Sequence, residues 1–229
     1  FLVWKNKMCG ILGYFSKYDI ADSKFFNLKN AANYLKERGP DYLGVIKNKN
    51  FFLSNSRLKI VSKKNYDLPL HKHKNYISFS GEILNYKELK NFLKNKNYKF
   101  FTDTDTEVIL SMYDYYGTEF VNYLKGFFSI CIFDTKKKLV ILAVDRIGNK
   151  SIFYNFSNNN FLINSQQSYL LKSKLLKFDA NKKKIDEYLV FGDISGNQTL
   201  HQNIKKMLPG QIIIYNFSSL KKYFYYELN

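Results

Sequence analysis

The 229-residue sequence predicts an α+β fold in which two antiparallel sheets are covered by helices. The first observation is the order of its segments, which runs strand, helix, several strands, two helices and then hairpins. The second is that two segments each contain a pair of apolar runs joined by a short polar turn, a pattern typical of antiparallel hairpins. The third is a hydrophobic content of 45%, which is enough for a large core.

The first strand is expected at residues 9–15, where CGILGYF forms a short apolar run. A helix is expected at residues 25–39, with Gly39 as its stop signal. Its apolar side chains recur at helical spacing, at Leu28, Ala31, Ala32 and Leu35. The RGPD segment at its end contains Pro40 and predicts a loop.

Three strand-like segments come next, at residues 42–46, 51–61 and 76–83. An amphipathic helix is expected at residues 86–95. A further helix is expected to begin at Thr104, because Glu107 three residues later completes a capping-box pattern. One face of this helix is expected to contain Val108, Met112 and Tyr115.

The two hairpins are expected in the second half of the chain. They cover residues 127–145 with a turn at 134–138, and residues 151–164 with a turn at 157–160. A short helix is expected near residues 166–176, another helix at 184–192 and a last strand at 211–217. We find neither an internal repeat nor a linker, so one domain is expected.

The composition excludes several classes of protein. No apolar run approaches the roughly 18 residues that span a bilayer. The opening FLVWKNK is shorter than the apolar core of a secretory signal, which needs about 7–15 residues. We therefore expect a cytoplasmic protein without a membrane partner. Cys9 and Cys131 are too few for a disulfide framework, which fits a reducing compartment.

The net charge of +17 raises the question of nucleic-acid binding. Lysine and asparagine are spread along the whole chain instead of forming one stripe. We therefore interpret the charge as a solvated surface and expect no nucleic-acid partner. Only three basic residues are arginine, namely Arg38, Arg57 and Arg146. Because a guanidinium offers a planar, bidentate fork that lysine cannot replace, these three positions are candidate functional residues.

Cys9 follows Met8 directly, and removal of Met8 would leave a free α-amine beside the Cys9 thiol. Such an amine, with a pKa of roughly 7.7–8.0, can accept the thiol proton near neutral pH. A histidine partner is then unnecessary. His71, His73 and His201 lie in polar segments that predict surface positions and no metal site. Taken alone, Cys9 is better interpreted as a small core residue.

Eight segments change this interpretation. They are MCGILGYF, RGPDYLG, SRLKIV, SGEILNYKEL, TDTEVIL, LKGFFSICIFD, LAVDRIGNKSIFY and IKKMLPGQ. In their order and spacing, from Met8 to about Tyr226, the chain resembles class II glutamine amidotransferase domains. The RGPD and GEI-NY wording is most similar to the amino-terminal half of glutamine-hydrolysing asparagine synthetases. This resemblance implies a four-layer αββα sandwich of two antiparallel sheets, the fold of N-terminal nucleophile hydrolases.

The resemblance also implies roles for individual residues. Cys9 corresponds to the catalytic N-terminal nucleophile, and Arg57 to the arginine that binds the α-carboxylate of glutamine. Glu82 and Asp105 correspond to acidic groups near the α-ammonium. Gly81 corresponds to the residue whose backbone N–H stabilises the oxyanion. One arginine opposed by carboxylates suits a zwitterionic ligand.

Four residues are expected near the site in structural roles. Arg38 and Asp41 belong to the RGPD loop, which is expected to lie beside the site and to be structural or gating. Asp145 and Arg146 belong to the DRIG segment, and a buried ion pair is the favoured interpretation for them. The resemblance implies no metal and no cofactor for this domain.

The sequence departs from the family pattern at several positions. Ser80 stands where the family usually has an asparagine that acts as second oxyanion donor, and a serine hydroxyl reaches less far. Loss of one such donor lowers the rate by roughly 10²–10³. SNS replaces a histidine-containing turn before Arg57, Ser151 replaces a proline, and Gln166 replaces a glutamate.

The resemblance implies a domain at residues 9–229 and an extension, residues 1–8, that is absent from the mature protein. The resemblance leads us to expect the family's synthetase domain outside these residues, and ATP and Mg²⁺ are expected only for that domain. The expected partners are L-glutamine and a synthetase domain or chain, with a homodimer left open.

The implied reaction is hydrolysis of the glutamine amide through a Cys9 thioester, which supplies ammonia for ATP-dependent amidation of aspartate or a related carboxylate. The alternative is a degenerate domain that binds glutamine or a partner domain without efficient turnover.

Overall fold

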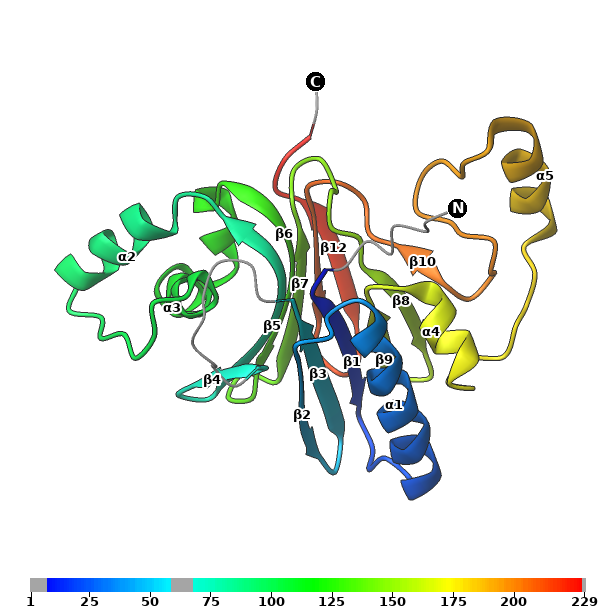
Figure 1. Ribbon diagram of the computed structural model, residues 1–229, viewed down its shortest axis with the longest axis horizontal. Coiled ribbons are helices and arrows are strands. Elements are labelled where there is room, and N and C mark those ends of the chain that lie inside the picture. The colour runs from blue at the N-terminus through cyan, green and yellow to red at the C-terminus, as the bar shows by residue number, and fades with distance from the viewer. Residues whose placement is uncertain (1–7, 59–67, 228–229) are drawn as a thin grey trace.

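The computed structural model describes residues 8–58 and 68–227. Two six-stranded antiparallel sheets lie face to face, with helices on both outer faces (Figure 1). The predicted α+β class and its four-layer αββα form are therefore confirmed.

The first sheet has the strand order β10-β8-β9-β1-β3-β2. Its strands are β1 (Gly10–Ser16), β2 (Tyr42–Asn48), β3 (Phe51–Arg57), β8 (Phe153–Ser157), β9 (Asn160–Asn164) and β10 (Lys205–Lys206). The first strand is internal and pairs with β3 on one side and β9 on the other. Cys9 immediately precedes it, so the residue lies at the end of an internal strand.

The second sheet has the strand order β12-β11-β7-β6-β5-β4. Its strands are β4 (Leu70–Lys72), β5 (Asn75–Ile83), β6 (Gly126–Asp134), β7 (Leu139–Val144), β11 (Gln211–Tyr215) and β12 (Leu220–Phe224). The central pair, β5 and β6, is aligned over nine residues, from Asn75 opposite Asp134 to Ile83 opposite Gly126.

Two helices cover each sheet. The first sheet carries α1 (Asp22–Tyr34) and α4 (Gln167–Lys172), and the second carries α2 (Tyr86–Asn95) and α3 (Asp105–Tyr116). The remaining helix, α5 (Lys182–Phe191), lies at one end of the molecule and has no buried residue (Figure 1). Short 3₁₀ helices follow α1 at Leu35–Glu37 and α3 at Gly117–Tyr123. Within the described ranges, no helix is long and apolar enough to cross a bilayer.

The core between the two sheets is aromatic. The ring of Phe133 in the second sheet lies 5.3 Å from Phe15 and 4.8 Å from Phe51 in the first. Phe161 is fully buried beside Tyr215, with ring centroids 5.2 Å apart. Alternation along each strand sends one set of side chains into this layer and the other towards the helices.

Most expected elements are confirmed, including both hairpins and their turns. Asn158 and Asn159 have φ of 49° and 57°, the left-handed pair that a two-residue hairpin turn requires. The part of the third expected strand at residues 59–61 lies outside the described residues. The strands β4, β10 and β12 were not predicted, because they are short or carry charged side chains at the sheet edges.

Two expected helix details are wrong. Gly39 does not end α1, which gives way to the 3₁₀ helix four residues earlier. The glycine is needed because a Cβ there would lie 2.7 Å from the backbone of Arg57. On α3, Val108 and Met112 are buried as expected, but Tyr115 is 40% exposed. That ring instead packs edge-on against Phe92 of α2.

The expected surface position of His201 is also wrong, although His71 and His73 are exposed. His201 is buried, with Nε2 2.7 Å from the carbonyl of Lys177 and Nδ1 accepting from the N–H of Asn203. The surrounding residues are polar, but backbone groups satisfy the ring, so segment polarity did not indicate burial.

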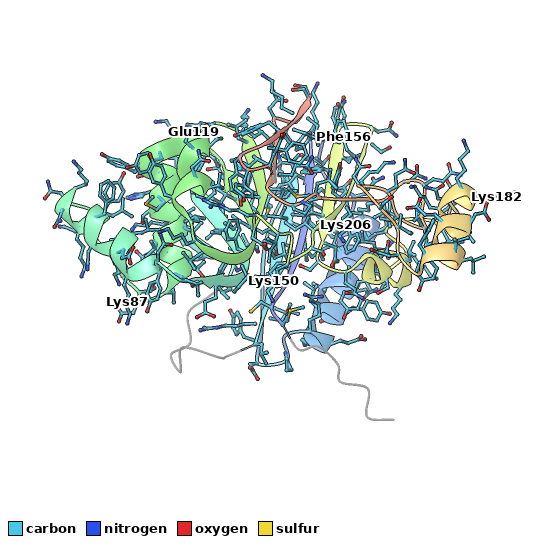
Figure 2. All side chains as sticks on the ribbon, turned by 90° about the horizontal axis from the view of Figure 1, so that it is seen from above. Lys87, Glu119, Lys150, Phe156, Lys182 and Lys206 are labelled. Atoms are coloured by element: carbon cyan, nitrogen blue, oxygen red, sulfur yellow. The ribbon has the colours of Figure 1, made fainter. Side chains whose placement is uncertain are left out.

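The lysines are distributed over the molecule. Figure 2 shows Lys87 on α2 and Lys182 on α5 at opposite ends, with Lys150 and Lys206 between them. This distribution agrees with the interpretation of the charge as a solvated surface.

The aromatic layer between the sheets generates a stability prediction. We expect Phe161→Ala to lower the free energy of unfolding by about 3–5 kcal/mol, because it leaves a cavity in a fully buried site. Chemical denaturation measures this difference. The matched control is Phe26→Ala on α1, where the ring is 66% exposed and the change should stay within about 0.5 kcal/mol. Equal effects of the two substitutions would contradict this assignment of the core.

Candidate active site

A cavity of about 150 Å³ lies beside the start of β1. Its lining comes from both sheets and from the start of α3. The residues are Cys9, Arg57, Leu58, Leu68, Leu70, Phe79, Gly81, Glu82, Tyr86, Asp103, Thr104, Asp105 and Thr106. Five predicted site residues, from four separate segments of the sequence, therefore line one cavity: Cys9, Arg57, Gly81, Glu82 and Asp105.

The Cys9 thiol is half-buried at the cavity wall. Its Sγ accepts from the N–H of Leu58 at 3.5 Å. Burial raises the pKa of the thiol above its usual value, whereas the Leu58 N–H and the Arg57 charge lower it. The Asp105 carboxylate raises the same pKa. The net effect favours the protonated thiol, so a base is needed to generate the thiolate.

The backbone of Cys9 is held by two side chains. The Ser80 hydroxyl donates to the Cys9 carbonyl at 2.9 Å, and Arg38 Nε donates to the same oxygen at 3.4 Å. Ser80 is buried and does not line the cavity. Its single hydroxyl proton is thus directed at the backbone of Cys9 and not into the cavity.

The RGPD loop connects Cys9 with Arg57. Arg38 Nη1 donates to Gln166 Oε1 at 3.3 Å, and the carbonyl of Arg38 accepts from the N–H of Met8 at 2.8 Å. The N–H of Asp41 donates to the carbonyl of Arg57 at 3.1 Å. The loop therefore braces residues on both sides of the thiol.

The charged groups of the cavity are one guanidinium and several carboxylates. Asp105 is the first residue of α3, and its Oδ2 accepts from the N–H of Ile83 at 3.2 Å. Burial raises the pKa of Asp105, hydrogen bonds from Ile83 and Thr106 lower it, and the nearby charge of Glu82 raises it. Arg57 ends β3 on the other sheet. Arg57 on the first sheet and the carboxylates of Glu82 on β5 and Asp105 on α3 complement a ligand that carries both charges.

Gly81 forms part of the cavity wall on β5, where it is paired with Phe128 of β6. Its φ is 146°, and a Cβ at this position would lie 2.0 Å from the carbonyl oxygen of Phe127. Only glycine fits both the conformation and the space. The close packing of β5 against β6 therefore fixes the backbone conformation of the cavity wall at Gly81.

Asp145 and Arg146 do not line the cavity, and the expected buried ion pair between them is wrong. The Asp145 carboxylate is buried and instead accepts from four backbone N–H groups, those of Phe128, Ile147, Asn149 and Lys150. Arg146 is exposed, with its guanidinium 4.9 Å from the centre of the Tyr226 ring. Backbone N–H groups therefore stabilise the Asp145 carboxylate in the place of a positively charged side chain.

Sequence reasoning missed Asn55. Its Nδ2 donates to the carbonyl of Gly10 at 2.9 Å, and its Oδ1 accepts from the N–H of Phe79 at 2.9 Å. The residue thus joins β3 to β1 in its own sheet and to β5 in the other. A polar residue inside the apolar run FFLSNSR was the available signal.

No group of three or more His, Cys, Asp or Glu side chains among the described residues is placed to hold a metal ion.

Comparison with known families finds a match to the glutamine amidotransferase domain over residues 8–226. A Methanocaldococcus jannaschii protein, provisionally named glutamine-hydrolysing asparagine synthetase 2, is 33% identical over 96% of this chain and 47% of its own length. The glutamine-hydrolysing asparagine synthetase 1 of Bacillus subtilis is 31% identical over 89% of this chain and 33% of its own length. The chain thus spans about half or less of these curated relatives.

Solved structures show the same fold. An allosteric regulatory enzyme of purine biosynthesis superposes with a TM-score of 0.68 at 15% identity, over 94% of this chain and 49% of that one. The glutamine phosphoribosylpyrophosphate amidotransferase of B. subtilis gives 0.63 at 16% identity, over the same fractions of the two chains. At these identities the likeness concerns the fold alone.

The electrostatics of Cys9 generate a pH prediction. The rate of its alkylation by iodoacetamide should rise with pH through a midpoint above that of a free cysteine, because burial disfavours the thiolate. Arg57→Gln should move this midpoint up, since it removes a cation, and Asp105→Asn should move it down, since it removes an anion. Mass spectrometry of the modified peptide measures the rates, with the fully buried Cys131 as an unreactive internal control. Midpoint shifts of the opposite sign would contradict this account of the site.

Proposed function

The chain belongs to the family of glutamine amidotransferase domains, and we propose that it hydrolyses the side-chain amide of L-glutamine with Cys9 as the nucleophile. The observation that carries this proposal is the shared cavity, which is lined by Cys9 together with Arg57, Glu82 and Asp105. Hydrolysis of the side-chain amide of an amino acid requires a nucleophile, a cation that binds the α-carboxylate and an anion that binds the α-ammonium.

Binding would use the two sheets as opposite sides of a clamp. The Arg57 guanidinium would hold the α-carboxylate, and Asp105 with Glu82 would hold the α-ammonium. The side-chain carboxamide would then extend to the Cys9 thiol. A bidentate arginine–carboxylate contact fixes orientation as well as position.

The reaction would proceed through a thioester. The Cys9 thiolate attacks the carboxamide carbon, and the backbone N–H of Gly81 stabilises the oxyanion that forms. The carbon–nitrogen bond then breaks as the nitrogen takes a proton, and ammonia leaves. Water attacks the thioester, which releases glutamate and regenerates the thiol.

The base for this reaction would be the α-amine of Cys9 itself. We propose that the active chain begins at Cys9, with residues 1–8 removed. No histidine is among the described residues that line the cavity, and the raised pKa of the thiol means that a nearby base is needed. An α-amine on the same residue meets this need.

The ammonia would be used by a synthetase unit of the kind that the named relatives imply. We propose that this unit, in the same chain or another, amidates aspartate or a related carboxylate with ATP and Mg²⁺. A domain that binds glutamine without turnover remains the second candidate, and the Ser80 hydroxyl, which donates to Cys9 instead of facing the cavity, is the observation that favours it.

Replacement of the nucleophile tests the proposal directly. In a chain that begins at residue 9, Cys9→Ala should reduce ammonia release from glutamine by at least about 10³-fold, because the thioester cannot form. Coupled assay of ammonia and glutamate measures the effect.

Cys131→Ala serves as the control, since this fully buried cysteine lies between the sheets. Ammonia release that survives Cys9→Ala would refute the proposed nucleophile. Intact-mass analysis that finds residues 1–8 retained in active protein would refute the proposed base.

The serine at position 80 generates a separate prediction. Ser80→Asn should raise kcat by up to about 10²-fold with little change in KM, because an amide can reach the oxyanion while the serine hydroxyl is directed at Cys9. Steady-state kinetics measure both constants. Ser80→Ala is the comparison, and a kcat for Ser80→Asn no higher than that of Ser80→Ala would show that the missing donor does not limit the rate.

A further inference from the structure

A buried ion pair behind the cavity has no part in the proposed chemistry. Lys72 ends the edge strand β4, Glu107 lies in the first turn of α3, and their Nζ and Oε1 atoms are 3.0 Å apart. Their side chains are only 7% and 2% exposed. Burial of two charges is unfavourable unless both are well hydrogen-bonded, so the partners of each charge indicate what the pair holds in place.

Glu107 organises the segment that enters α3. Its carboxylate accepts from the N–H of Phe101 at 3.0 Å, the N–H of Thr102 at 2.7 Å and the hydroxyl of Thr102 at 2.7 Å. Burial works against the charged form, but the hydrogen bonds from Thr102 and Lys72 outweigh it and lower the pKa of Glu107. The carboxylate thus remains charged and fixes the turn that leads to Asp105.

The start of α3 is also capped by Thr104, the residue before its first turn. The Thr104 hydroxyl accepts from the N–H of Glu107 at 3.4 Å, which is one half of the predicted capping box. The second half differs from the prediction, because the Glu107 side chain reaches back to Phe101 and Thr102 and not to Thr104. Three consecutive residues between this turn and Glu107, namely Thr104, Asp105 and Thr106, line the cavity.

Lys72 connects this turn with the opposite wall. Its ammonium donates to the carbonyl of Lys99 at 2.7 Å and to the Ser111 hydroxyl at 3.0 Å, and it lies 4.8 Å from the centre of the Phe100 ring. Leu70, two residues earlier on the same short strand, lines the cavity. One cation therefore ties the edge of the second sheet to α3 and to the segment that precedes it.

We propose that Lys72 and Glu107 are positioning residues that set the place of Asp105 and thereby the affinity of the cavity for the α-ammonium of glutamine. This inference rests on the proposed function. One hydrogen bond, from Ile83, holds the Asp105 carboxylate to β5, whereas the ion pair holds the backbone from which Asp105 projects. A displacement of this backbone changes the separation between Asp105 and Arg57, which must match the two charges of one amino acid.

The test compares glutamine with an analogue that lacks the α-amino group, 4-carbamoylbutanoate. In Lys72→Met, KM for glutamine should rise by roughly ten- to a hundredfold, because a misplaced binding group loses its contact, while kcat changes by less than about threefold. The inhibition constant of 4-carbamoylbutanoate should stay unchanged, since this compound has no ammonium for Asp105 to bind. An equal loss for both compounds, or a fall in kcat alone, would overturn the inference.

Two further variants separate positioning from stability. Lys72→Met combined with Glu107→Gln removes both buried charges, so the thermal stability should recover while KM for glutamine stays high. Recovery of KM together with stability would show that the pair is only structural. The matched control is Tyr113→Phe, which removes a buried hydrogen bond of 2.9 Å to Asp134 from the same helix, away from the cavity. Its KM should equal that of the parent protein, and a rise like that of Lys72→Met would overturn the inference.

A binding measurement keeps this inference distinct from the proposed function. Calorimetry with Cys9→Ala as the parent gives the Kd of glutamine without turnover, and addition of Lys72→Met should raise this Kd by the same factor as KM. An unchanged Kd would overturn the inference and leave the proposed function intact. A parent protein that binds no glutamine would overturn both. Binding without ammonia release by the Cys9 chain would overturn the proposed hydrolysis alone.

Discussion

The site depends on hydrogen bonds that join the two sheets at the end of β1. Asn55 connects Gly10 in the first sheet with Phe79 in the second, and the Ser80 hydroxyl donates across the same junction to Cys9. A further bond runs from the Ser78 hydroxyl to the carbonyl of Ser54 at 3.2 Å. Away from this junction the layer between the sheets is largely apolar, apart from contacts such as the bond from Lys222 Nζ on β12 to the Tyr154 hydroxyl on β8. Apolar packing tolerates sliding better than directional contacts do. The bonds at the end of β1 fix the register between Cys9 beside one sheet and the Gly81 backbone on the other.

The chain has only three arginines, and each of them lies at a specific position in the structure. Arg57 lines the cavity, Arg38 contacts the Cys9 carbonyl and Gln166, and Arg146 lies over the ring of Tyr226. Arg38 uses two nitrogen atoms of its fork and Arg146 presents its guanidinium to a ring, and a lysine offers neither shape. The lysines serve mainly as solvated charge, and Lys72 is an exception among them because its ammonium is buried and directs three hydrogen bonds.

The fold was predictable from the sequence wherever local patterns decided the structure. The two hairpins, the amphipathic α2 and the start of α3 follow from periodicity and turn residues that lie close together in the chain. The burial of His201, the exposure of Tyr115 and the backbone shell around Asp145 depend on distant partners that no local pattern encodes. The members of the site were found from motif resemblance. The hydrogen bonds that join the two sheets beside the site were not predicted, because Asn55 contacts backbone groups that lie 24 and 45 residues away in the sequence.

The charges of the cavity bear on how the thiol would be activated. Arg57 is opposed by Glu82 and Asp105, whereas the third carboxylate, that of Asp103, is paired with Lys90 at 2.9 Å. At the thiol, burial raises the pKa most, the charges of Arg57 and Arg38 lower it and the charge of Asp105 raises it, so burial is the main reason why the thiolate is disfavoured. A zwitterionic substrate adds no net charge, because its carboxylate offsets Arg57 while its ammonium offsets Asp105. Substrate binding alone would then leave the thiol protonated. Its deprotonation needs a base, and an unblocked α-amine on Cys9 itself would satisfy that condition.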